Sequence, residues 1–135
     1  MADTDSGPPG ALRRFLELYA ADRFWDSHEA LEDAWRRTGS DFYQGLILYA
    51  SAWVHWERGN AHGVRAQLRK AMERLAGYPA SYLGIDVAAV REHCAEVRRT
   101  VASDPEGWPG RVAAGPLAFD AERVRGDEVE LEAVR

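Results

Sequence analysis

Apolar side chains recur along this chain with the spacing of α-helices that pack one face against a core. Through most of the first hundred residues they return every three or four positions, which is the helical period. The pattern predicts five helices, over residues 11–21, 26–37, 41–58, 60–76 and 86–101. Asp26 or Ser27 is expected to cap the second helix, and Asn60 the fourth. The pattern therefore predicts a mainly helical chain from residue 11 to about residue 101.

The third predicted helix differs from the others because apolar residues surround most of its axis. Its members include large aromatic and aliphatic side chains on two opposite sides. A helix of this kind belongs in the middle of a bundle. The short turns between helices indicate antiparallel neighbours. We therefore predict an all-α fold, a bundle of about five antiparallel helices with an irregular C-terminal tail.

The two ends of the chain differ from this helical part. Residues 1–10 are polar, end in Pro-Pro-Gly, and are expected to be disordered. Residues 11–103 are predicted to form the bundle domain, and residues 104–135 a tail with several Pro and Gly residues. The isolated apolar residues Trp108, Leu117 and Phe119 are expected to anchor this tail on the bundle. A small hairpin is also expected around residues 124–131.

Charge and cysteine content narrow the classes of function. Seventeen basic and 22 acidic residues give a net charge of −5, so the chain has no general attraction for nucleic acid or anionic lipid. Cys94 is the single cysteine and lies in an apolar stripe, so it is expected to be a small buried residue. The longest apolar run is shorter than the roughly 20 residues that span a membrane. We expect a soluble, cytoplasmic protein that binds neither nucleic acid nor membrane.

The stretch SHEALEDAW places polar residues on the apolar side of the second helix. Taking His28 as the origin of the helical wheel, Glu32 lies at about +40° and Trp35 at about −20°, near Phe24 and Leu31. Two interpretations remain open. The pair either satisfies itself locally as part of the structure, or supplies two ligands for a divalent metal such as zinc.

The third helix carries further polar residues that are candidates for the same site. Gln44, Leu48, Ser51 and His55 share one face at spacings of four, three and four. If the second helix packs on this face, the polar residues of both helices converge on one small cavity. The candidate metal ligands are then His28, Glu32 and His55, with Glu29, Trp35, Gln44 and Ser51 lining the site. His62 and His93 are interpreted as ordinary residues of helix surfaces.

Motif patterns add one resemblance and argue against one class of enzyme. The order H-x-x-x-E-x-x-W, then FYQGLI, His55, Gly-Asn and GIDV resembles the family called domain of unknown function 309, over about residues 12–100. The resemblance implies an all-α fold without an established activity, and metal binding through His28 and Glu32. The stretch HEALE also approaches the zinc-protease pattern H-E-x-x-H, but Glu32 replaces the second histidine, which argues against a protease.

Two classes of function follow from these observations. The first is a polar site between the second and third helices that binds a divalent metal or performs acid–base chemistry, with Glu29 or Glu32 as proton acceptor. The alternative is a module of helical hairpins that binds another protein in a groove, for which the five tryptophans supply contact area. The sequence specifies no substrate, reaction, partner or oligomeric state.

Overall fold

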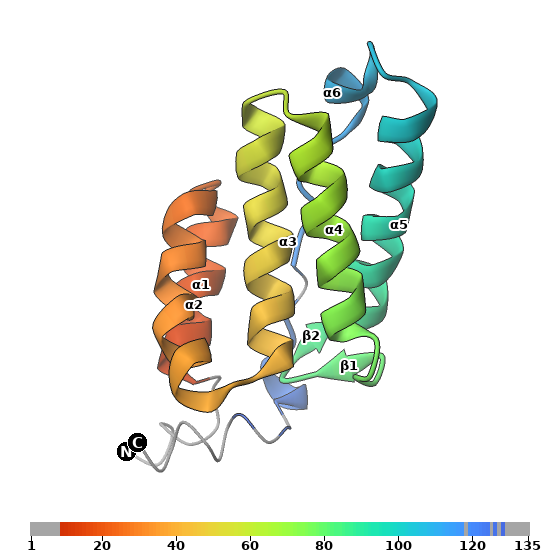
Figure 1. Cartoon of the computed structure of the whole chain (residues 1–135). Helices are drawn as coiled ribbons and strands as arrows, with labels where there is room; N and C mark the ends of the chain where they lie inside the picture. The colour runs from red at the N-terminus through yellow and green to blue at the C-terminus, as the bar shows by residue number, and fades with distance from the viewer. Residues whose placement is uncertain (1–8, 118, 125, 127, 129–135) are drawn as a thin grey trace.

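The computed structural model describes residues 9–117, 119–124, 126 and 128, and its architecture is a helical bundle. The main helices are α1 (Gly10–Ala20), α2 (Phe24–Thr38), α3 (Asp41–Glu57), α4 (Ala61–Leu75) and α5 (Val87–Ser103). The pair α1 and α2 packs on one side of α3, while α4 packs on the other side and α5 packs on α4 (Figure 1). The predicted all-α fold is confirmed. Among the described residues, no helix is long and apolar enough to cross a membrane.

The helix starts show how short polar side chains set the boundaries. Ser40 accepts a hydrogen bond from the backbone N–H of Tyr43 at the start of α3. Asn60 and Asp86 act in the same way at the starts of α4 and α5. The prediction for α2 was wrong, since this helix begins two residues before Asp26. Ser27 is no cap there, because its hydroxyl donates to the carbonyl of Phe24 within the first turn.

The core surrounds α3, as its apolar composition predicts. Trp53, Tyr43 and Tyr49 are among the largest fully buried side chains, and all three lie on this helix. The helices α3 and α4 approach closely at Gly45, where a Cβ atom would lie 2.7 Å from the side chain of Leu75. Only a residue without a side chain leaves room for that contact.

Short elements that the sequence analysis missed follow the bundle. The strands β1 (Ser81–Tyr82) and β2 (Ile85–Asp86) pair in an antiparallel hairpin. One turn of helix, α6 (Trp108–Arg111), interrupts the tail that was predicted to be irregular. Pro109 is compatible with this turn, because a proline in the first turn of a helix lacks only an N–H that would be unpaired in any case. A 3₁₀ turn, η2, covers Ala121–Arg123.

The described part of the tail packs along the bundle and returns to the hairpin (Figure 1). Trp108 is buried, and the indole of Trp56 donates a hydrogen bond to the carbonyl of Pro109. Phe119 forms a β-bridge with Ile85. Glu128 is buried and accepts hydrogen bonds from the hydroxyls of Ser40 and Tyr82. Residues 1–8 and most of the hairpin expected around 124–131 lie outside the described residues.

Candidate functional site

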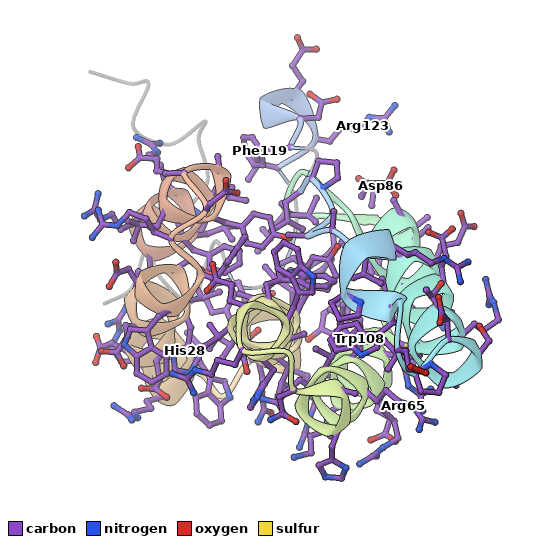
Figure 2. The ribbon with its side chains drawn as sticks, turned by 90° about the horizontal axis from the view of Figure 1, so that it is seen from above. His28, Arg65, Asp86, Trp108, Phe119 and Arg123 are labelled. Carbon is purple, nitrogen blue, oxygen red and sulfur yellow. The ribbon has the colours of Figure 1, made fainter. Side chains whose placement is uncertain are left out.

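His28 and Glu32 lie one turn apart on α2, at the border between its buried and its solvent-facing sides. Their side chains are 18% and 25% exposed, and His28 Nε2 lies 3.8 Å from Glu32 Oε2. Figure 2 shows His28 on the side of α2 nearer to α3. The buried face of the helix runs instead through Phe24, Ser27, Leu31 and Ala34. The pair therefore flanks the apolar face, whereas the sequence had placed it in the middle of that face.

The two side chains do not satisfy each other by a hydrogen bond. The separation of 3.8 Å exceeds the 3.2 Å that limits an ordinary N–H···O bond. His28 Nδ1 is buried and has no hydrogen-bond partner among the described residues. Glu32 has one close partner in Arg36, whose guanidinium lies 3.1 Å from Oε1. Mutual hydrogen bonding therefore does not explain why a histidine stands at this position.

An exposed tryptophan lies beside the pair. The side chain of Trp25 is 57% exposed, and among the described residues no other large hydrophobic side chain is exposed. Its ring packs against the imidazole of His28, with centroids 5.2 Å apart. Trp35, which the sequence analysis placed at the site, is partly buried against the core. Trp25 was not predicted as a site residue, although it falls about 60° from His28 on the helical wheel.

The polar residues near the end of α3 do not join this pair, contrary to the expected convergence. His55 Nδ1 lies 3.0 Å from the amide nitrogen of Asn60, in the turn between α3 and α4. Ser51 accepts a hydrogen bond from Gln67 of α4. Both therefore face α4, whereas His28 lies on α2 at the other side of α3 (Figure 1). Among the described residues, no group of three or more His, Cys, Asp or Glu side chains is placed to hold a metal ion.

The remaining predicted residues differ in burial and in direction. Gln44 is partly buried on α3, and Glu29 is exposed on α2. Glu29 follows His28 directly, so it projects about 100° further round the helix. His55 is partly buried and packs against Gly63, where a Cβ atom would lie 2.3 Å from its Nδ1. Burial lowers the pKa of His55, and the nearby charges of Arg58 and His62 lower it further.

A second histidine was misjudged from the sequence. His93 was interpreted as a surface residue of α5, but it is partly buried and its Nδ1 lies 2.7 Å from the hydroxyl of Tyr49. Burial lowers the pKa of His93 and raises that of Tyr49. On the helical wheel His93 lies within about 60° of the buried residues Val90 and Val97, which was the available signal. His93 connects α5 to α3 through this contact and is not a residue of the α2 site.

Comparison with known proteins supports the predicted resemblance over part of the chain. No curated protein matches the sequence. The matched segment of the family comparison contains His28, Glu32 and His55, and it extends from α1 into α4. Residues 12–67 match the family described as Domain of unknown function (DUF309), which confirms the predicted resemblance for this segment.

Proposed function

We propose that His28 and Glu32 form a ligand-binding site on α2 that is open to solvent, and that its ligand is a divalent cation such as zinc. The observation that carries this proposal is the state of His28. It is a partly exposed imidazole without a hydrogen bond to any described residue, and its Nε2 faces a carboxylate oxygen 3.8 Å away. Two ligand atoms about 2.1 Å from one tetrahedral cation lie about 3.4 Å apart. A small rotation of either side chain therefore brings both atoms into coordination distance.

The described residues fit such a cation only in part. The described residues supply one imidazole and one carboxylate, so other donors, such as water or a group from a bound partner, must complete the coordination. Arg36 competes for the carboxylate, because its guanidinium lies 3.1 Å from Glu32. Coordination through Nε2 also leaves the proton on the buried Nδ1 without an acceptor, which costs about 1–3 kcal/mol. We therefore expect weaker binding than at a closed site with four protein ligands.

Binding fits this arrangement better than catalysis does. A bound cation would act as a Lewis acid and lower the pKa of its water ligand. Glu32 already serves as a ligand, and Glu29 projects about 100° away from His28 round the helix. Since neither carboxylate is placed as a separate proton acceptor, we do not assign a reaction to the pair.

Calorimetric titration of protein lacking a polyhistidine tag with zinc tests the proposal. We expect wild-type protein to bind one zinc ion, and His28→Ala and Glu32→Gln to lose this binding. Glu29→Gln is the matched control, because it makes the same chemical change on the same helix at an exposed position. Absence of zinc binding by the wild type, or an equal loss in Glu29→Gln, would contradict the proposal.

A protein-interaction surface on the same helix is the second candidate, favoured by the exposure of Trp25. Tryptophan and arginine are enriched among the residues that dominate binding energies at interfaces. Trp25 and Arg36 lie on the same side of α2 as the His28–Glu32 pair. A second copy of the chain is the first partner to test. Sedimentation velocity at increasing concentration should then show self-association that Trp25→Ser removes, and a monomer at all concentrations would argue against this partner.

A further inference from the structure

A hollow with a strongly basic lining lies between α4 and α5, away from the α2 site. Its volume is about 230 Å³, and it is lined by His62, Arg65, Ala66, Arg69 and Arg98. Figure 2 shows Arg65 on α4, on the side that faces α5. We call this feature the α4–α5 hollow. Its lining contains no acidic residue, although the whole chain has a net charge of −5.

The spacing of the lining residues explains why they meet. His62, Ala66 and Arg69 follow each other at intervals of four and three, so they share one face of α4 with Arg65. Arg98 approaches from α5, and Ala66 leaves space between the longer side chains. The hollow thus lies between two helices that pack together, and this packing fixes the positions of the backbones that carry the lining residues.

Two of the three arginine charges in this lining are not compensated within the described part of the chain. Arg69 is paired with Glu73, at a distance of 2.9 Å. Neither Arg65 nor Arg98 forms an ion pair with a residue in the described part of the chain. Arg98 Nε is moreover buried and has no hydrogen-bond partner there. An anion bound in the hollow would compensate the charges of both guanidinium groups.

We propose that the α4–α5 hollow binds a phosphate group that carries two negative charges. The two uncompensated arginines match the charge of about −1.5 to −2 on a phosphate monoester near neutral pH, whereas one carboxylate would balance only one of them. Guanidinium groups also match the oxygens of phosphate in paired, charge-assisted hydrogen bonds. The volume is several times the roughly 30 Å³ that a water molecule occupies in the liquid. The hollow therefore has room for a tetrahedral anion.

The phosphate group has two possible sources, which one experiment separates. Inorganic phosphate and adenosine monophosphate are titrated separately into 15N-labelled full-length protein at pH 8 and low chloride, and the backbone amide shifts are followed. We expect saturable shifts confined to α4 and α5. Equal affinities assign recognition to the phosphate group alone, and tighter binding of the nucleotide assigns the site to a phosphate ester.

Variants of the lining test the assignment of the site. Arg65→Gln and Arg98→Gln should each weaken binding by about tenfold, because each removes a charged hydrogen-bond donor. Arg65 is exposed, so its variant remains informative if the change at the partly buried Arg98 disturbs folding. Lys70→Gln and Arg99→Gln are matched controls that remove one charge from the same two helices outside the lining. Equal losses in the controls, shifts elsewhere in the protein, or no saturable binding of either ligand would overturn the proposal.

Discussion

Two histidines, one on α2 and one on the side of α3 that faces α4, differ in whether the protein supplies a hydrogen-bond partner for the ring. At the turn between α3 and α4, His55 is held by Asn60 and by close packing on Gly63. On α2, His28 contacts the ring of Trp25 and the carboxylate of Glu32 without a hydrogen bond. The first arrangement accounts for its histidine by structure alone. The second leaves polar atoms that a ligand could use, which is why we place the site on α2.

The largest expected difference in stability is between two tryptophan variants, one in the interior and one on the surface of α2. Trp53→Ala should lower the free energy of unfolding by about 3–5 kcal/mol, because Trp53 is a fully buried residue of α3. Trp25→Ala should change it by less than about 0.5 kcal/mol, since that side chain is mostly in solvent. Urea denaturation measures both values. Similar losses in the two variants would show that Trp25 supports the fold rather than a binding surface.

Alanine substitution in the turn that holds His55 should also cost more stability than alanine substitution at the start of α2. Asn60→Ala should cost about 1–2 kcal/mol, because the side chain caps α4 and contacts His55. The corresponding residue of α2, Arg23, makes no capping hydrogen bond. Its replacement by alanine should cost less than about 1 kcal/mol, the usual limit for an exposed ion pair such as Arg23–Asp26. Thermal unfolding measures both losses. Equal destabilisation of the two variants would contradict the prediction.

A lower pH should reduce the stability of the fold, because two of its histidines are partly buried. The pKa of His93 is lowered by burial, so the folded state binds fewer protons than the unfolded state as the pH falls below about 6.5. Stability should therefore fall as the pH drops through this range, and His55 contributes in the same direction. His93→Gln should flatten the dependence measured between pH 7.5 and 5. An unchanged slope would show that His93 is not the source.

Removal of His28 should have only a small effect on stability. Because the imidazole makes no hydrogen bond to a described residue, His28→Ala removes only its packing and should lower the free energy of unfolding by less than about 1 kcal/mol. A loss of about 1–3 kcal/mol would instead indicate a structural pair with Glu32. Chemical denaturation of this variant beside Glu32→Gln decides between the two.

Much of the bundle follows from local rules that act within a few residues. Ser40, Asn60 and Asp86 were recognisable as helix starts, because a short polar side chain can accept a bond from an N–H in the first turn. The start of α2 was misplaced, since no capping side chain marks it. The hairpin was missed because strands of two residues show no alternation of apolar and polar positions.

The candidate site was predictable only as far as one helix determines it. His28 and Glu32 are neighbours because both lie on α2, and their spacing of four residues fixes that. His55 and Ser51 were assigned to the wrong neighbour, because α3 is apolar on most sides and its pattern does not show where α2 or α4 packs. The contact of Glu128 with Ser40 joins residues far apart in the sequence, which no local pattern encodes.

Zinc titration of two matched histidine variants tests the central contrast most directly. His28→Ala and His55→Ala make the same change on opposite sides of α3, and circular dichroism confirms that each variant is folded. If the site lies on α2, isothermal titration calorimetry will show that His55→Ala retains the zinc binding of the wild type and that His28→Ala loses it. Retention of zinc binding by His28→Ala, or its loss in His55→Ala, would contradict this account.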